Sequence, residues 1–106
     1  MAEGENWLVK FILVDSGQRL SLQRHCNREE FWTVIRGSGV ATVGGDTVEL
    51  DVGTDAVCIP MLAWHRITAE TTLEIVEVQR GQCDENDIER KEDDYGRAKK
   101  DELGGV

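Results

Sequence analysis

The sequence predicts an all-β domain, either a sandwich or a barrel. Short runs rich in β-branched and aromatic residues recur along the first eighty residues, and turn residues separate them. No stretch before residue 80 shows a sustained 3.6-residue hydrophobic period, so we expect no helix of useful length there. The chain has 106 residues, of which 40% are hydrophobic, and this suffices for one domain with one core. Many short strands at regular turn spacing are typical of a sandwich or barrel.

Each expected strand ends at a turn signal. The first strand stops at Asp-Ser-Gly (15–17), and a later one stops at Gly-Ser-Gly (37–39). Gly-Gly-Asp (44–46) separates two runs and predicts a hairpin. Asp-Val-Gly (51–53) is another turn, and Pro60 ends a short apolar strand. The expected strands are residues 7–14, 19–25, 30–36, 40–43, 47–50, 56–59, 66–68 and 72–79.

Four side chains of the expected strands are candidate metal ligands. Gln23 and His25 are two residues apart, so on a strand they point to the same face. Glu30 follows after a short polar gap, and His65 is the second of only two histidines in the chain. Two imidazoles, one carboxylate and one amide oxygen can surround a first-row transition metal and leave one position open. The pattern therefore predicts one divalent metal ion (Zn, Mn, Co, Ni or Fe) at Gln23, His25, Glu30 and His65.

Charge and composition exclude several classes of partner. The formal net charge of −9 argues against nucleic acid, whose backbone requires a cationic surface. No apolar run approaches eighteen residues, so no membrane-spanning segment is expected. The N-terminus lacks a signal-peptide pattern, and Cys26, Cys58 and Cys83 show no disulfide-framework spacing. We therefore expect a cytoplasmic protein with reduced thiols.

The spacing of the candidate ligands resembles the metal motif of the cupin barrels. That motif is His-x-His, four residues, Glu, and a distant Pro-x-Gly-x-x-His; here Gln23 stands at the first His and Leu62 at the Gly. With these substitutions, the chain from about Lys10 to Arg97 resembles the C-terminal isomerase domain of type II phosphomannose isomerases, which usually also carry mannose-1-phosphate guanylyltransferase. The matching segments are Gly17-Gln18-Arg19-Leu20-Ser21-Leu22-Gln23-x-His25, Arg28-x-Glu30-x-Trp32-x-Val34-x-x-Gly37, Ile59-Pro60, His65-Arg66, Ile75-Val76-Glu77-Val78-Gln79-x-Gly81 and Asp87-Ile88-x-Arg90-x-x-Asp93-x-Tyr95-Gly96-Arg97.

The resemblance implies a fold, a domain extent and a reaction. The fold would be a cupin-type double-stranded β-helix (jelly-roll) barrel, with one domain over residues 1–97 and a flexible C-terminal tail over 98–106. The last motif implies that residues 84–97 are ordered and reach the active site. The reaction would be a metal-dependent interconversion of mannose 6-phosphate and fructose 6-phosphate through a cis-enediol. Because the sequence lacks the glycine-rich nucleotide signature, guanylyltransferase activity is not expected.

The resemblance also assigns cationic residues to the substrate phosphate. Arginine suits this task because its planar fork gives two charge-assisted hydrogen bonds. Arg28, Arg90 and Arg97 match positions that the family needs for activity. Lys10 matches a family lysine on the strand that leads into the site, where it either contacts phosphate or pairs with a carboxylate. Arg66 is a weaker substrate-binding candidate, because it directly follows a ligand and points to the opposite face.

Two other functions compete with the isomerase. The first is a non-catalytic cupin that binds a sugar or nucleotide sugar as an accessory or regulatory subunit. The second is a small oxygen-using cupin, which usually has histidine at position 23, so Gln23 argues against it. We also expect a homodimer, because cupins commonly pair through edge strands and sheet faces and the apolar run 7–14 is a natural edge to cover.

Overall fold

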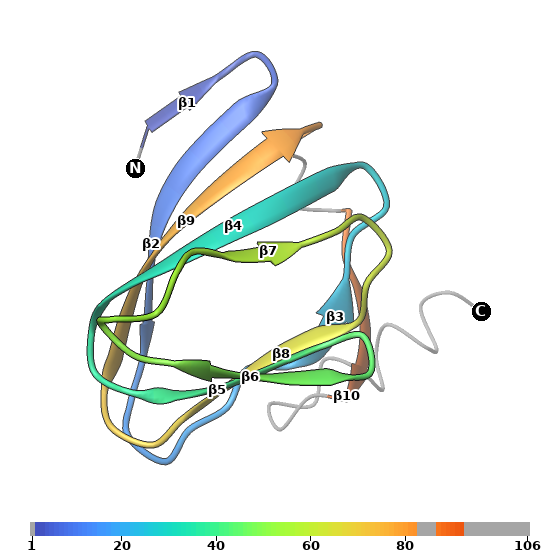
Figure 1. The fold of residues 1–106 in the computed structure, drawn as a ribbon. Coiled ribbons are helices and arrows are strands. Elements are labelled where there is room, and N and C mark those ends of the chain that lie inside the picture. The colour runs from blue at the N-terminus through green and yellow to red at the C-terminus, as the bar shows by residue number, and fades with distance from the viewer. Residues whose placement is uncertain (1, 83–86, 93–106) are drawn as a thin grey trace.

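The computed structural model describes residues 2–82 and 87–92, which form two facing antiparallel sheets (Figure 1). The first sheet has the strand order β1-β2-β9-β4-β7, and the second has the order β10-β3-β8-β5-β6. The strands are β1 (Ala2–Gly4), β2 (Trp7–Val14), β3 (Leu22–Arg24), β4 (Arg28–Arg36), β5 (Gly39–Val43), β6 (Asp46–Leu50), β7 (Val57–Ile59), β8 (His65–Ala69), β9 (Leu73–Gly81) and β10 (Glu89–Glu92). All the strand pairs in the described part of the chain are antiparallel.

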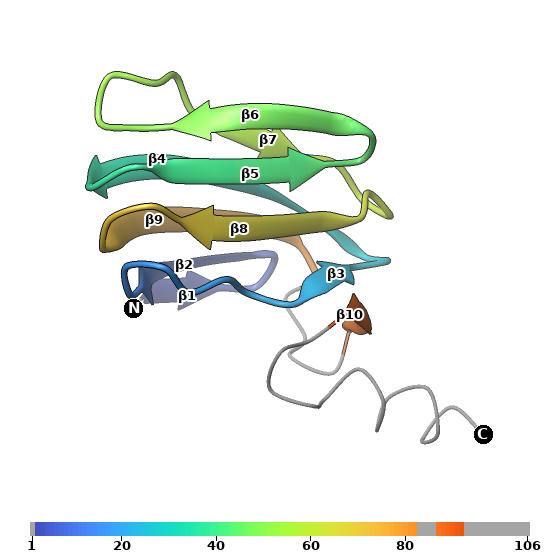
Figure 2. The same ribbon diagram turned by 90° about the horizontal axis from the view of Figure 1, so that it is seen from below.

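The hydrophobic core lies between the two layers, which Figure 2 shows one in front of the other. Alternation along the strands produces it: β4 buries Trp32 and Val34, and β9 buries Leu73 and Ile75, while the residues between them face outward. The buried hydrophobic residues are Val14, Trp32, Val34, Ala41, Leu50, Val57, Ile59, Ile67, Ala69, Leu73 and Ile75. The same alternation also turns polar residues of β4 and β9 inward at one end of the barrel.

Most of the expected strands are confirmed with shifts of one or two residues. The strand expected over 7–14 is β2, and the predicted hairpin joins β5 to β6, with Gly44 in the left-handed region at φ 60°. The strand expected over 19–25 is shorter: only β3 is regular, and Arg19 forms an isolated bridge to Thr68. Strands β1 and β10 were not expected, because neither Ala-Glu-Gly nor the fully charged Glu-Arg-Lys-Glu shows a strand pattern.

The expectation that 7–14 is an edge strand is correct for only part of its length. Strand β1 pairs with Trp7–Val9, so the first half of β2 lies between two strands. The second half, including Phe11 and Leu13, pairs with β9 on one side. Residues 87–92, within the segment expected to be ordered, are described and contain β10, whereas Arg97 and the tail 98–106 lie outside the described residues. Across the described ranges there is no helix long and apolar enough to cross a membrane.

Candidate metal centre

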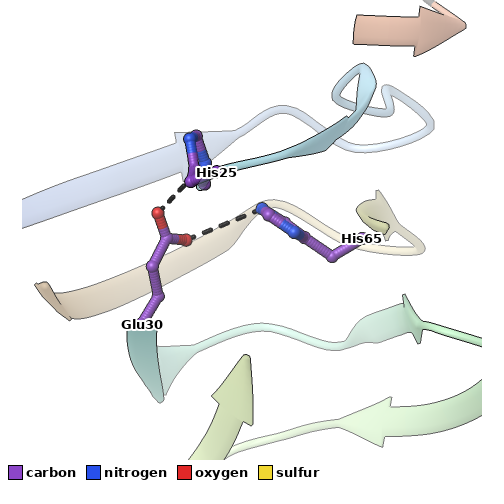
Figure 3. Close-up of side chains that lie close together, drawn as sticks. All are labelled: His25, Glu30 and His65. Carbon is purple, nitrogen blue, oxygen red and sulfur yellow. Dashed lines mark ion pairs between the residues drawn. The ribbon is translucent and has the colours of Figure 1, made fainter. Parts of the chain in front are cut away.

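The side chains of three of the four predicted ligands point toward one another, as Figure 3 shows. Their ligand atoms, one each from His25, Glu30 and His65, all lie within 4.8 Å of one another. His25 Nε2 is 3.2 Å from Glu30 Oε2, and His65 Nε2 is 3.7 Å from Glu30 Oε1. All three residues are buried.

The strand pairing explains why residues so distant in sequence meet here. Glu30 lies on β4 and His65 begins β8, while His25 directly follows β3. Gln23 of β3 is the cross-strand partner of His65, which brings His25 beside it. The loop before β8 is tied to the same place, because the Leu62 N–H donates to the His25 carbonyl oxygen at 2.8 Å. Leu62 has a φ of 66°, so this leucine adopts the left-handed conformation that favours the glycine of the cupin motif.

Both imidazoles are held with one nitrogen facing the carboxylate. His25 Nδ1 lies 2.6 Å from the Asp87 carbonyl oxygen, and His65 Nδ1 lies 2.9 Å from the Ala63 carbonyl oxygen. A carbonyl oxygen can only accept, so each Nδ1 carries the hydrogen and each Nε2 presents a lone pair. A backbone carbonyl that fixes the tautomer in this way is a common support of metal-binding histidines.

The surroundings keep both histidines neutral. Burial lowers the pKa of His25 to about 4, and the nearby charge of Arg28 acts in the same direction. Burial also lowers the pKa of His65. A metal ion binds only the neutral imidazole. Because both rings are already neutral near pH 7, neither has to lose a proton before it can bind the metal.

Glu30 lies between hydrogen-bond donors and a second carboxyl group. Arg28 Nε donates to Oε2 at 3.0 Å, and Trp32 Nε1 donates to Oε1 at 3.3 Å. Burial nevertheless raises the pKa of Glu30 to about 8, and a hydrogen bond with Glu77 and the charge of Glu77 act in the same direction. The Glu30 carboxyl group therefore retains a proton near neutral pH that a metal would have to displace.

Glu77 is a buried carboxyl group that the sequence interpretation missed. It accepts from Trp32 Nε1 at 3.0 Å and from Gln79 Nε2 at 2.8 Å, and Lys10 Nζ lies 3.5 Å away. Burial alone would raise the pKa of Glu77, but hydrogen bonds from Glu30 and Gln79 lower it, and the charge of Lys10 adds to this. The signal was present in the sequence: Glu77 and Gln79 alternate in phase with Ile75, which points them to the buried face of β9.

The donor set fits a first-row divalent metal. His65 Nε2 is buried and has no hydrogen-bond partner, and its lone pair faces a carboxylate oxygen, an arrangement that a cation would satisfy. His25, Glu30 and His65 would supply two imidazole nitrogens and one carboxylate. The fourth predicted ligand, Gln23, lines the adjacent cavity, where its Oε1 accepts from the Ser21 hydroxyl at 2.9 Å. The Ser21 hydroxyl thus directs this amide oxygen.

Arg28 contacts lone pairs that a metal would use. In addition to its bond with Glu30, its Nη2 lies 3.1 Å from His25 Nε2. The guanidinium is buried beside two of the three ligands, so it contacts the ligand set directly. The prediction that Arg28 is a residue of the site agrees with this position, and its role toward a substrate stays a prediction.

A cavity of about 300 Å³ opens beside the ligands, which is at the small end of ligand pockets. Its polar lining includes Lys10, Gln23, Glu30, His65 and Glu77. Of the cations that line the cavity, Lys10 is the most accessible, since its side chain is 40% exposed whereas those of Arg28 and Arg66 are buried. Trp32 is buried in the core and also lines this cavity.

The remaining predicted arginines lie in different places. Arg66 lines the cavity, but its guanidinium donates to the Leu20 carbonyl at 2.9 Å and pairs with Glu92 at 3.0 Å. Arg90 lies on β10, where its backbone pairs with Gln23. Arg97 lies outside the described residues. The structure thus brings the predicted ligands, Arg28 and Lys10 together, and it gives Arg66 structural partners.

The fold and the inward-facing ligands define a cupin-type β-barrel. The structure is similar to a cupin-2 domain protein from Rhodospirillum rubrum, with a TM-score of 0.67, 23% identity, and coverage of 82% of this chain and 63% of that chain. It is also similar to a salicylate 1,2-dioxygenase from Pseudaminobacter salicylatoxidans, with a TM-score of 0.64, 20% identity, and coverage of 71% and 21%. At this level of identity the two structures establish the fold alone.

The family model described as "Mannose-6-phosphate isomerase C-terminal" matches residues 1–93, and the chain belongs to this family. It is 42% identical to the alginate biosynthesis protein AlgA of Pseudomonas aeruginosa and 37% identical to the mannose-1-phosphate guanylyltransferase ManC of Salmonella typhimurium; each match covers 89% of this chain and 20% of the relative. It is 41% identical to the xanthan biosynthesis protein XanB of Xanthomonas campestris, over 89% of this chain and 21% of the relative. The chain thus spans about a fifth of the length of these relatives.

Proposed function

We propose that this domain is a metal-dependent sugar-phosphate isomerase that interconverts mannose 6-phosphate and fructose 6-phosphate through a cis-enediol. The observation that carries the proposal is the convergence of His25, Glu30 and His65 beside a cavity of about 300 Å³. Membership in a family described by mannose-6-phosphate isomerase gives the substrate class. The fold alone would be compatible with many chemistries, so the site and the family carry the argument together.

The reaction makes three demands on the chain. An aldose–ketose interconversion moves a proton between C1 and C2 while negative charge develops on the oxygens of the enediol. A bound divalent cation would supply Lewis-acid stabilisation of that charge. Glu30 and Glu77 both line the cavity, and because Glu30 would hold the metal, Glu77 is the lining carboxyl group left available for the proton transfer. The phosphate must be held away from the reacting carbons, so that its binding energy orients them.

Lys10 is the cation that the cavity presents to a phosphate. Its ammonium group lies 3.5 Å from Glu77 and remains accessible, so it can meet an anion in the cavity while Glu77 keeps its hydrogen bonds from Trp32 and Gln79. Arg66 is less suitable, because its guanidinium already bonds the Leu20 carbonyl and Glu92. We retain Arg28, Arg90 and Arg97 as substrate-binding candidates from the family motifs. The structure thus favours Lys10 for the first test.

The position of Arg28 favours a second candidate function. A guanidinium that donates to both His25 and Glu30 satisfies part of the ligand set without a metal. A cupin of this kind could bind a sugar or nucleotide sugar as an accessory subunit and catalyse nothing. Metal content and isomerase activity distinguish the two candidates.

The decisive experiment is a coupled assay of the metal-reconstituted protein against a panel of hexose 6-phosphates. The account predicts formation of fructose 6-phosphate from mannose 6-phosphate by the wild type. It predicts no formation by His65→Gln, which preserves a polar side chain of similar size but removes the imidazole. Arg36→Gln, on the exposed far end of β4, serves as a matched control with wild-type activity. Metal binding by the wild type without activity on any sugar would favour the accessory role.

We also propose that two copies of this domain associate through the outer face of the first sheet. Phe11 (71% exposed), Leu13 (62%) and Ile35 (47%) project from that face, and no described element covers them. Two opposite charges on it, Glu29 and Arg80, are cross-strand neighbours and offset each other. In a chain with a net charge of −9, this face lets two copies approach with little repulsion. A second copy is therefore a better occupant than a strongly charged partner.

A further inference from the structure

One metal ligand depends on a segment that lies far from it in the sequence. The His25 ring is oriented by the carbonyl oxygen of Asp87, 62 positions away, at 2.6 Å from Nδ1. The corresponding acceptor for His65 is Ala63, two residues away in its own loop. The orientation of His65 is thus determined locally, whereas that of His25 requires residues 87–92 to be docked on the barrel.

The Asp87 side chain fixes the position of its own carbonyl group. Its Oδ1 accepts from the backbone N–H of Cys26 at 2.9 Å, and its Oδ2 accepts from the N–H of Asn27 at 2.8 Å. These two amides directly follow His25, so Asp87 hydrogen-bonds both the His25 ring and the backbone beside it. The N–H donors lower the pKa of the Asp87 carboxyl group against the effect of its burial, which keeps it an ionised acceptor.

The rest of the segment is fastened to the same sheet. Strand β10 pairs with β3, with Glu89 opposite Arg24 and Arg90 opposite Gln23. An ion pair of 2.9 Å joins Arg24 to Glu89, and another of 3.0 Å joins Arg66 to Glu92. Figure 2 shows β10 beside β3 at the margin of the second sheet. The segment 87–92 therefore has its own anchors after the contact with His25.

We propose that Asp87 is a positioning residue for the metal centre: its carboxylate anchors the segment, and its carbonyl fixes the tautomer and orientation of His25. The proposal deepens the proposed function, because it assumes that His25 is a metal ligand. Loss of a support of this kind typically weakens metal binding 10- to 100-fold. Because coupling between two events is reciprocal, a bound metal must stabilise docking of residues 87–92 by the same factor.

The first test needs no metal. The chain has two histidines, so the ring nitrogens of both can be assigned in long-range ¹H–¹⁵N spectra of ¹⁵N-labelled protein. In the metal-free wild type both rings should show the Nδ1–H tautomer. In Asp87→Ala the signals of His25 should shift toward a mixture of tautomers, while those of His65 stay unchanged as an internal reference. An Asp87→Ala spectrum with His25 unchanged would overturn the proposal.

The second test measures affinity for Co²⁺ by titration of the metal-free protein. Asp87→Ala should bind Co²⁺ 10- to 100-fold more weakly than the wild type. The matched control is Asp51→Ala, which also removes an aspartate that caps a backbone N–H (Gly53, 2.8 Å) but lies in the turn after β6. The control should bind as the wild type does, and equal affinity for Asp87→Ala would overturn the proposal.

Hydrogen exchange completes the design and separates two kinds of failure. Saturation with Co²⁺ should slow exchange of the amides in residues 89–92 in the wild type, and unchanged exchange would contradict the coupling. If the wild type binds no Co²⁺ at all, the proposed metal-dependent function fails. The tautomer spectra then still decide whether Asp87 positions His25.

Discussion

His65 Nε2 faces Glu30 Oε1 across 3.7 Å, and no hydrogen bond joins them. The Ala63 carbonyl holds the hydrogen of the His65 ring on the other nitrogen, so two acceptors face each other inside the barrel. Such an arrangement is stable only if a positive charge or a proton lies between or beside the acceptors. Burial raises the pKa of Glu30 to about 8, so a proton on Glu30 can meet this need near neutral pH. A bound metal ion would meet the same need.

The first prediction concerns the stability of the metal-free protein between pH 6.5 and 8. The pKa of Glu30 is raised from 4.5 to about 8 on folding, so its contribution to stability is full below pH 4.5 and is lost as the pH rises through 8. The lowered pKa of His25 makes the stability rise with pH, but this effect is complete once the pH has passed 6.5, the ordinary pKa of histidine. The free energy of unfolding should therefore fall by about 1–2 kcal/mol from pH 6.5 to pH 8.

Urea unfolding with a chelator present measures this fall. Glu30→Gln is the control, because its amide does not titrate, and its stability should be nearly constant over the same interval. A wild-type stability that rises with pH, or an equal fall in Glu30→Gln, would show that Glu30 is not the protonated group.

The second prediction concerns Arg28, whose guanidinium lies 3.0 Å from Glu30 Oε2 and 3.1 Å from His25 Nε2. Removing this cation should tighten divalent metal binding by at least about tenfold, because two like charges at this range repel by a few kcal/mol even at an effective dielectric of about 20. Titration of Arg28→Gln with Co²⁺ tests the prediction, with Arg36→Gln on the same strand as the control. Weaker binding by Arg28→Gln would mean that Arg28 supports the ligands and does not compete with the metal.

The third prediction separates a phosphate contact from a structural cation. Lys10→Ala should raise KM for mannose 6-phosphate about 10- to 100-fold, the usual effect of one lost charge-assisted contact, while metal affinity stays the same. Arg66→Ala should instead lower the free energy of unfolding by about 1.5–3 kcal/mol, because it breaks the bonds to Leu20 and Glu92. Steady-state kinetics and urea unfolding of both variants test the prediction. If Arg66→Ala raised KM and Lys10→Ala lowered the stability, Arg66 would be the phosphate contact and Lys10 the structural cation.

The fourth prediction concerns the outer face of the first sheet. Phe11→Glu should shift the protein from dimer to monomer in sedimentation velocity at micromolar concentration, because it places a charge in the proposed contact. Val52→Glu is the matched control, since Val52 is 63% exposed on the turn after β6. A monomeric wild type, or a dimer that survives Phe11→Glu, would exclude this face as the interface.

The β-strands and the ligand positions could be predicted from the sequence because both depend on local pattern. The apolar run that ends at Asp-Ser-Gly gave β2, and the spacing of His25, Glu30 and His65 carried the cupin motif. Strand β10 could not be predicted, since it is fully charged and gains its order from pairing with β3. The contact from Asp87 that orients His25 could not be predicted either, because no sequence pattern indicates that a backbone carbonyl 62 residues away lies beside the ring.

The second carboxyl group of the site was visible in the pattern but not interpreted. Glu77 follows Ile75 in the buried phase of β9, so its burial could have been inferred from alternation alone. What alternation does not reveal is its neighbour: only the pairing of β9 with β4 places it against Glu30 and Trp32. The role of Arg28 has the same origin, because the contact with His25 arises from the turn between β3 and β4.

The central claim is that His25, Glu30 and His65 hold one divalent metal, and metal analysis of the purified protein tests it most directly. The measurement is the number of first-row metal ions bound per chain after reconstitution and removal of excess metal, for the wild type and His65→Gln side by side. The account predicts about one ion per wild-type chain and a large loss in His65→Gln, with both proteins folded by circular dichroism. A folded wild type that retains no metal, or a His65→Gln variant that retains as much as the wild type, would contradict the account.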